Sequence, residues 1–257
     1  MADSTSAAAV SALMARVIGA VRAVESATFE HLLIVEPALP AGDAANGLVI
    51  PDPASVGVDV RNVVAGAHNY AESIGPKIIS LEQMCDAQAQ PAADRGWPLW
   101  IGEYGAWSID QANLSLLRRF AAAADVHLAG SAQWQWVQRC GDPHSIGIPN
   151  NPSVTTQYQL SIMACPQDEV SRRNQEFLAI AGRAYPRQAP GELVEVTSDL
   201  TARTLTVRGD ATGAAAGHLV AWVPGVDPPR TATTGLVDVR QVRGTSGWYI
   251  TATPKGG

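Results

Sequence analysis

The first two thirds of the chain alternate between segments with helical periodicity and short runs of continuously apolar residues. The helical spacing of apolar positions predicts helices over residues 6–25, 78–89, 109–125 and 168–183. The apolar runs predict strands at residues 31–35, 62–67, 99–101 and 128–136. Short apolar strands that alternate with helices indicate a parallel sheet with helices packed outside it.

The pattern changes at residues 185–191, which read Tyr-Pro-Arg-Gln-Ala-Pro-Gly. Beyond this junction the helical period disappears, and short β-type runs follow at residues 193–196, 204–207, 218–223, 236–239 and 248–253. Gly, Asp and Pro separate these runs, which is typical of a small antiparallel β-sandwich. We therefore expect two domains, residues 1–186 and residues 187–257.

Composition excludes several classes of function. The 257 residues are 46% hydrophobic and 16% charged, and the net charge is −6 with scattered basic residues. This distribution carries no basic patch for nucleic acid or an anionic membrane. No apolar run approaches the roughly 18 residues that a membrane-spanning helix needs. The first residues also lack the basic and apolar regions of a signal peptide.

The three cysteines do not form a recognisable metal or redox motif. They are Cys85, Cys140 and Cys165, and no Cys-x-x-Cys or His-Glu-x-x-His segment occurs. The sequence therefore predicts no metal and no cofactor. A disulfide between Cys140 and Cys165, which flank a loop-rich segment, is one alternative, and three unpaired thiols are the other.

One carboxylate lies among most of the tryptophans. Five of the seven tryptophans fall between Trp97 and Trp136, and Glu103 follows Trp100 in this segment. Sugars present flat C–H faces that stack on indole rings, and cleavage of a glycosidic bond requires carboxylates. The alternative is that the tryptophans are ordinary core residues and Glu103 is a solvated loop charge.

Each predicted strand ends at a residue suited to a sugar site. In order along the chain these residues are Glu36, His68 with Tyr70, Glu103, and Trp134 with Trp136. In a parallel β/α barrel, functional side chains gather at the C-terminal strand ends. Glu36 can alternatively be a loop carboxylate and His68 a hydrogen-bonded core histidine. Because side chains alternate along a strand, Trp134 and Trp136 do not face the same side.

These segments together resemble the family 5 glycoside hydrolases, the cellulase-like retaining β-glycosidases. Residues 100–106 resemble their nucleophile strand, residues 68–70 a His-x-Tyr segment at the sixth strand, and residues 133–136 the tryptophan at the eighth strand. The endoglycoceramidase-type members are the most similar. Their pattern is matched by Glu36-Pro37, by Cys-Gly-Asp-Pro-His at residues 140–144 and by the junction at residues 185–191.

The resemblance implies a TIM-barrel (β/α)8 fold of which this chain supplies only strands five to eight, followed by the β-sandwich. It implies Glu103 as the nucleophile and substrate contacts from Glu36, His68, Tyr70, Trp134 and Trp136. The implied substrate is a glycolipid of the glycosylceramide kind or a related β-glucoside. Family resemblance also favours a secreted, extracellular protein.

The resemblance leaves a gap in the chemistry. The family's acid/base glutamate lies in an Asn-Glu-Pro segment at the fourth strand, and this sequence contains no such segment. The ends of strands five and seven lie roughly 10 Å apart, so Glu36 suits substrate contact better than proton donation. We expect an incomplete, weakly active chain that lacks an N-terminal half-barrel. Two alternatives stay open: a non-catalytic protein that binds carbohydrate or glycolipid, and a half-barrel subunit that needs a partner chain.

Overall fold

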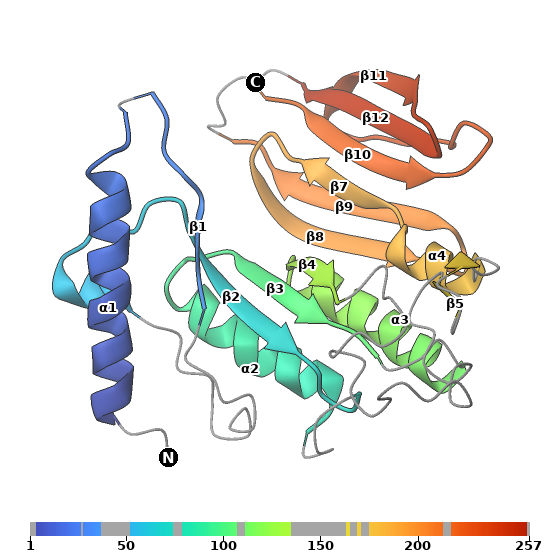
Figure 1. Ribbon diagram of the computed structural model, residues 1–257. Coiled ribbons are helices and arrows are strands. Elements are labelled where there is room, and N and C mark those ends of the chain that lie inside the picture. The colour runs from blue at the N-terminus through green and yellow to red at the C-terminus, as the bar shows by residue number, and fades with distance from the viewer. Residues whose placement is uncertain are drawn as a thin grey trace. The chain divides into compact units, whose positions relative to one another are not determined.

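The computed structural model describes residues 4–26, 28–36, 52–73, 79–106, 111–134, 163–164, 169–170, 175–212 and 217–255. The chain divides into two compact units, Met1–Arg172 and Arg173–Gly257 (Figure 1). Across the described ranges, no helix combines the length and the apolar character needed to cross a bilayer.

A four-stranded parallel sheet forms the centre of the first unit, with strand order β1-β2-β3-β4. Its elements are α1 (Ser4–Arg22), β1 (Leu33–Val35), the 3-10 helix η2 (Pro53–Val56), β2 (Val63–Asn69), α2 (Leu81–Ala93), β3 (Leu99–Tyr104), α3 (Gln111–Val126) and β4 (Gly130–Gln133). A short antiparallel pair, β5 (Met163–Ala164) with β6 (Glu169–Val170), follows. All four predicted strands are confirmed, and their order matches the order along the chain.

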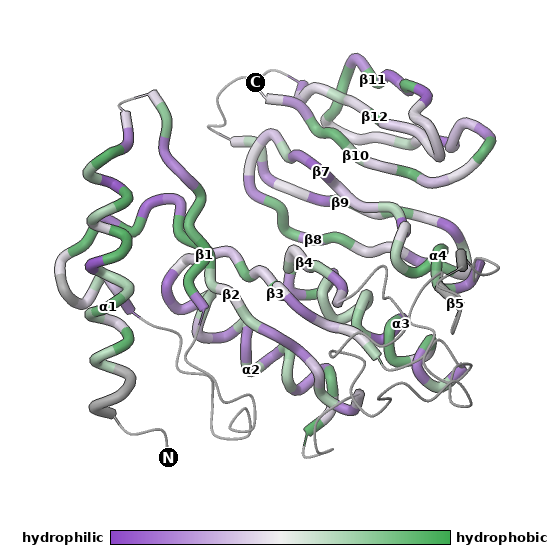
Figure 2. Tube along the Cα trace, in the orientation of Figure 1, coloured by the Kyte–Doolittle hydropathy of each residue, from purple (hydrophilic) through white to green (hydrophobic). Residues whose placement is uncertain are grey.

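Helices α2 and α3 pack on the sheet through apolar stripes. A capping box begins α2, in which the Ser80 side chain accepts from the Gln83 backbone N–H and the Gln83 side chain accepts from the Ser80 N–H. Hydrophobic and hydrophilic residues alternate along both helices (Figure 2), and Phe120 of α3 stacks on Tyr104 of β3 with ring centroids 3.7 Å apart. This packing leaves the opposite face of the sheet free of α2 and α3.

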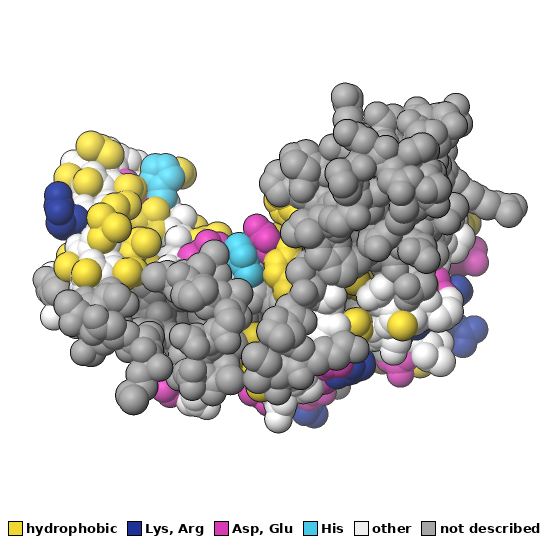
Figure 3. Space-filling view, turned by 60° about the horizontal axis from the view of Figure 1, so that its bottom comes forward, with side chains coloured by type: hydrophobic (Ala, Val, Ile, Leu, Met, Phe, Trp, Pro, Cys, Tyr) yellow, Lys and Arg dark blue, Asp and Glu magenta, His cyan; other side chains and the backbone are white. Residues whose placement is uncertain are grey.

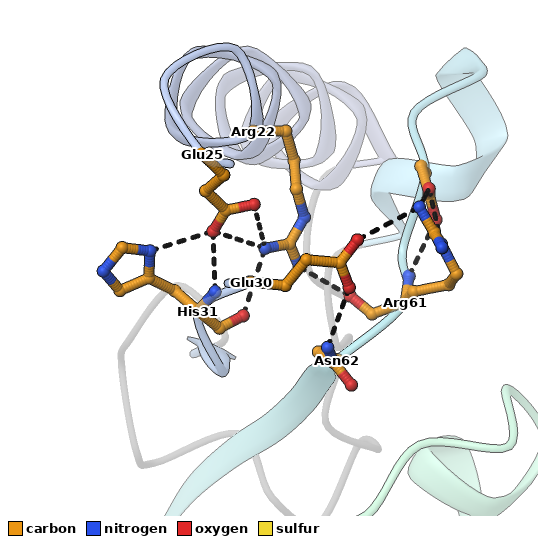
Figure 4. Close-up of polar contacts among 7 residues, drawn as sticks. Arg22, Glu25, Glu30, His31, Arg61 and Asn62 are labelled. Atoms are coloured by element: carbon orange, nitrogen blue, oxygen red, sulfur yellow. Dashed lines mark hydrogen bonds and ion pairs between the residues drawn. The ribbon is translucent and has the colours of Figure 1, made fainter. Parts of the chain in front are cut away.

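A polar cluster joins the end of α1 to the beginnings of β1 and β2 (Figure 4). The Arg22 guanidinium donates to both carboxylate oxygens of Glu25 at 2.8 Å, and also to the backbone carbonyls of His31 and Arg61. Glu25 in turn accepts from the backbone N–H of His31 at 2.7 Å. The bond from Arg22, supported by those from His31, lowers the pKa of Glu25 to about 2. Arg22 and Glu25 therefore bond the end of α1 to the residues that precede β1 and β2.

This cluster predicts an acid-sensitive contribution to folding. A carboxyl group whose folded pKa lies below its ordinary value stabilises the protein above that ordinary value and loses the effect as the pH falls. Glu25→Gln is therefore expected to lower the free energy of unfolding at neutral pH, and the difference from the parent should vanish as the pH falls from about 4.5 to about 2. Urea unfolding across this range measures it. Asp227→Asn, at an exposed carboxylate, is the control, and a difference that is independent of pH would contradict the prediction.

The second unit contains two antiparallel sheets. Its elements are α4 (Gln175–Ala181), β7 (Tyr185–Gln188), β8 (Glu192–Asp199), β9 (Thr204–Asp210), β10 (Leu219–Pro224), β11 (Leu236–Arg243) and β12 (Gly247–Pro254). The larger sheet has the order β11-β12-β10-β7, and β8 pairs with β9 in the smaller one. Val196, Ala221, Ile250 and Ala252 are buried and contribute to the core of this unit. The predicted β-sandwich is confirmed.

One predicted helix is wrong over its first part. Glu169 and Val170 pair with Met163 and Ala164 as a strand, and α4 covers Gln175–Ala181. The sequence between Val170 and Phe177 holds only polar and charged residues, so no apolar stripe connects the two segments. β7 was also not predicted, and it begins within the junction at residues 185–191.

Candidate functional site

Alternation along β2 sends two candidate residues away from the helices. The buried Asn69 amide faces α2, where it donates to the Leu81 carbonyl and to the Cys85 sulfur, both at 3.2 Å. Because successive side chains point to opposite faces, His68 and Tyr70 lie on the other face of the sheet. The buried Gln88 of α2 donates to the His68 backbone carbonyl at 2.7 Å. The carboxyl end of β2 is therefore fixed from the helix side.

A register shift in β3 turns Glu103 to the same face. Ala67 of β2 is opposite Ile101, but the next residue, His68, is opposite Glu103, so Gly102 is an extra residue. Without this bulge, alternation would place Glu103 with the buried Ile101 on the helix side. Bulges of this kind change the direction in which a side chain points, and they occur beside active sites. The bulge thus presents Glu103 to the free face of the sheet.

Four of the predicted residues come together in what we call the strand-end cluster: Glu36, His68, Tyr70 and Glu103. The Tyr70 hydroxyl donates to Glu103 Oε2 at 2.9 Å. His68 lies between the two carboxylates, with Nε2 3.4 Å from Glu36 Oε1 and Nδ1 3.6 Å from Glu103 Oε2. Near the centre of Figure 3, histidine and acidic side chains lie side by side at the surface. The alternative interpretation of His68 as a core residue is wrong, because its side chain is 22% exposed and faces two carboxylates.

Two glycines leave the space that Glu36 occupies. A Cβ on Gly66 would lie 2.5 Å from Cγ of Glu36 and 2.9 Å from a methyl of Ile34. A Cβ on Gly102 would lie 3.3 Å from Glu36 Oε1 and 3.6 Å from His68 Nε2. Glu36 therefore reaches across β2 toward β3, although it follows β1.

Gly66→Ala is expected to move Glu36 away from His68. The added methyl requires Glu36 and Ile34 to shift, at a cost of about 1–3 kcal/mol in unfolding free energy. The measurement is the pair of His68 ring-nitrogen chemical shifts by NMR, which should change. Gly19→Ala in α1, where nothing lies within 4 Å of the new methyl, is the matched control. His68 shifts that are identical in both variants would contradict this account of Glu36.

The electrostatics of the cluster orient Glu103. Burial, together with the bond to Glu103 and its charge, raises the pKa of Tyr70 well above its ordinary range. The hydroxyl therefore stays protonated at neutral pH and remains a donor. Both contacts of Glu103 fall on Oε2, and among the described residues no hydrogen bond or ion pair reaches Oε1. One carboxylate oxygen is held while the other faces away from these two partners.

Trp100 is a residue on this face that the sequence did not single out for the site. A Cβ on Gly130 would collide with its six-membered ring, and its Nε1 lies 3.5 Å from the position of a Cβ on Gly102. The absent side chain at Gly130 lets the indole ring lie against β4. The sequence signal was available, since a glycine on the neighbouring strand often marks close approach of another group.

The aromatic and cysteine predictions are only partly covered by the structure. Trp134 directly follows β4 and is 39% exposed. Trp136, Cys140 and Cys165 lie outside the described residues. Cys85 is a buried free thiol, and burial raises its pKa to about 11. Within the described part of the chain, no three His, Cys, Asp or Glu side chains are grouped so that they could hold a metal ion.

Comparison with solved structures identifies similar proteins over nearly the whole chain. An endogalactoceramidase crystal structure is 31% identical, with 97% of this chain and 52% of that chain covered and a TM-score of 0.76. Endo-glycoceramidase II from Rhodococcus sp., as its lactosyl-enzyme intermediate, is 18% identical over 96% of this chain and 54% of that chain, with a TM-score of 0.58. No family profile and no curated protein matches the chain.

These similarities confirm the resemblance and the fold class predicted from the sequence. The chain spans about half the length of the solved structures that it matches. Its four parallel strands and its antiparallel sheets correspond to part of a TIM barrel followed by a β-sandwich.

Proposed function

We propose that this chain, which resembles endoglycoceramidase-type glycoside hydrolases, carries the nucleophile of a retaining β-glycosidase. The observation that supports this most strongly is the strand-end cluster, in which Tyr70 and His68 hold Glu103 at the carboxyl ends of parallel strands. Barrel enzymes carry their active sites at that end. The proposed substrate is a glycolipid in which a sugar is β-linked to ceramide, or a related β-glucoside, consistent with the similarity to endogalactoceramidase.

In this proposal Glu103 attacks the anomeric carbon and forms a covalent glycosyl-enzyme intermediate, which water then hydrolyses. The Tyr70 hydroxyl donates to Oε2 and orients the carboxylate, which leaves Oε1 for the attack. His68 binds a sugar hydroxyl, and Trp134 or Trp136 provides an indole surface for the sugar ring. Each of these roles uses a group that the reaction needs, and none requires a metal or a cofactor.

The second carboxylate of the reaction is proposed to come from a complementary half-barrel. A retaining enzyme needs two carboxyl groups about 5 to 5.5 Å apart. Glu36 does not suit this role, because the His68 ring lies between it and Glu103. The sequence holds no Asn-Glu-Pro segment, and the chain matches only 52% of endogalactoceramidase. Glu36 is therefore proposed as a substrate contact, and the chain by itself as weakly active.

We also propose residues 1–186 as the barrel part and residues 187–257 as the sandwich domain, with an extracellular location. The boundary rests on the change from helical to β-type periodicity at residues 185–191, and the location rests on the resemblance. Proteolysis at the junction tests the boundary.

A second candidate function is binding of carbohydrate without hydrolysis. The imidazole between the two carboxylates favours it, because such a cluster can hold sugar hydroxyls without donating a proton to a leaving group. Binding of a β-glucoside with no turnover, under conditions where the complementary half-barrel is bound, would support this alternative.

The experiment that tests the proposal is complementation. The chain is mixed with the part of endogalactoceramidase that this chain does not match, and hydrolysis of a glycosylceramide is followed together with size-exclusion chromatography. That part lacks the segment that β3 matches, so any turnover requires this chain. We expect a complex with turnover well above that of either chain. A stable complex without turnover would contradict the proposed glycosidase, and no complex would contradict the half-barrel partner.

A further inference from the structure

The four-stranded sheet of the second unit carries a row of aromatic rings on its outer face. Strand register aligns Tyr185 of β7, Trp222 of β10 and Tyr249 of β12 directly across the sheet. The neighbours Ala221 and Ile250 are buried, at 5% and 7% exposure, so they face the core of this unit. Because side chains alternate, the three rings lie on the opposite face. We call this row the aromatic platform.

Two glycines leave room for the indole ring of Trp222. A Cβ on Gly247 would lie 2.6 Å from Cη2 of Trp222, and one on Gly244 would lie 3.3 Å from Cζ3. Tyr249 packs beside the indole, with ring centroids 5.2 Å apart and an angle of 56° between the planes. Tyr185, at the end of the row, is 42% exposed.

Positive charge accompanies the rings. The Arg187 guanidinium lies 5.5 Å from the centroid of the Tyr249 ring, and its Nη1 donates to the Tyr249 hydroxyl at 3.3 Å. Arg240 of β11 is exposed and lies opposite Thr251, on the same face as Tyr249. Neither arginine forms an ion pair with a carboxylate among the described residues. Both guanidinium groups are therefore available to an anion.

The charge of the whole second unit also favours binding of an anion. Residues 173–257 contain nine Arg or Lys and seven Asp or Glu residues, whereas residues 1–172 contain nine and seventeen. The unit that carries the platform thus has more basic than acidic residues, although the net charge of the whole chain is −6. An anionic ligand would be attracted to this unit and repelled by the other.

We propose that the aromatic platform of the second unit binds a carboxylate-bearing glycan. Indole and phenol rings stack on the flat C–H faces of sugar residues. Guanidinium groups bind carboxylates through paired, charge-assisted hydrogen bonds, which neutral sugars do not offer. This function goes beyond the proposed hydrolysis, since it needs neither Glu103 nor a complementary half-barrel.

The test uses the full chain and two probes, 3′-sialyllactose and lactose, with binding measured by titration calorimetry. We expect sialyllactose to bind at least tenfold more tightly than lactose, and the difference to shrink at high salt. Trp222→Ala should weaken binding of both sugars at least tenfold. Arg240→Gln, at an exposed position, should weaken sialyllactose alone. Arg187→Gln, which also removes the contact with Tyr249, should weaken sialyllactose more than lactose.

Glu103→Gln separates this proposal from the proposed hydrolysis, because it should leave binding of sialyllactose unchanged. Loss of binding in Glu103→Gln would assign the sugar to the strand-end cluster and overturn the platform. Equal affinity for the two sugars, or insensitivity to both arginine variants, would also overturn it. Binding to phosphatidylserine vesicles but not to sialyllactose would contradict the proposal that the ligand is a glycan, and it would identify a lipid surface as the partner.

Discussion

Glu103→Gln is expected to lower glycosidase turnover by about 10⁴-fold or more in the complemented enzyme, while the complex still forms. Loss of a catalytic nucleophile has effects of this size because no other group can form the covalent intermediate. The amide of glutamine can still accept the hydrogen bond from Tyr70, so the fold around it should change little. The measurement is the rate of glycosylceramide hydrolysis by parent and variant at saturating substrate.

Glu36→Gln is the matched control for this variant, since it changes the other carboxylate that faces His68. As a substrate contact, Glu36 should affect KM more than kcat. A Glu36→Gln variant that lost as much kcat as Glu103→Gln would contradict the proposed division of roles. So would residual turnover above about one per cent in Glu103→Gln.

Phe120→Ala is expected to destabilise the first unit by about 3–5 kcal/mol. Phe120 is only 1% exposed and stacks on Tyr104, the last residue of β3. Removing its ring leaves a cavity beneath the strand that presents Glu103, and typical domains have only about 5–15 kcal/mol of stability. Urea unfolding followed by tryptophan fluorescence measures the loss, because Trp97 and Trp100 lie in this unit.

Val126→Ala is the control in the same helix, because Val126 ends α3 and is 75% exposed. Its free energy of unfolding should stay within about 0.5 kcal/mol of the parent. If Phe120→Ala cost no more than this control, the stacked pair would not be holding β3 in place.

The barrel half was predictable because its strands are short and apolar throughout, and because polar residues follow each one. Parallel strands have their carboxyl ends at one edge, so strand order brought Glu36, His68 and Glu103 to the same edge of the sheet. Helix periodicity predicted α2 and α3 because their buried residues repeat at helical spacing.

The details of the site were not predictable from periodicity. Regular alternation from Ile101 would put Glu103 on the wrong face, and the extra residue at Gly102 shows only in the pairing of β2 with β3. The reach of Glu36 across Gly66 likewise depends on the space between two strands. A sequence pattern shows which side chains are apolar, but it does not show where a strand contains a β-bulge.

Long-range polar contacts were also beyond the sequence analysis. Arg22 and the Arg61 carbonyl are far apart in the chain, and nothing local indicates that they are bonded at 2.6 Å. The wrong first part of the helix at residues 168–183 has a similar cause. The strand there depends on pairing of Val170 with Met163, which no local propensity indicates.

The central claim is that Glu103 attacks the anomeric carbon of a sugar, and covalent trapping tests it most directly. The chain, alone and with its complementary half-barrel, is incubated with 2-deoxy-2-fluoro-β-glucosyl and β-galactosyl fluorides. Fluoride leaves without a proton, so no general acid is needed, and the fluorine at C2 slows hydrolysis of the intermediate. Mass spectrometry should find one sugar per chain on the peptide that contains Glu103, and none in Glu103→Gln. Labelling of another residue, or an unlabelled chain in a complex that hydrolyses glycosylceramide, would contradict the account.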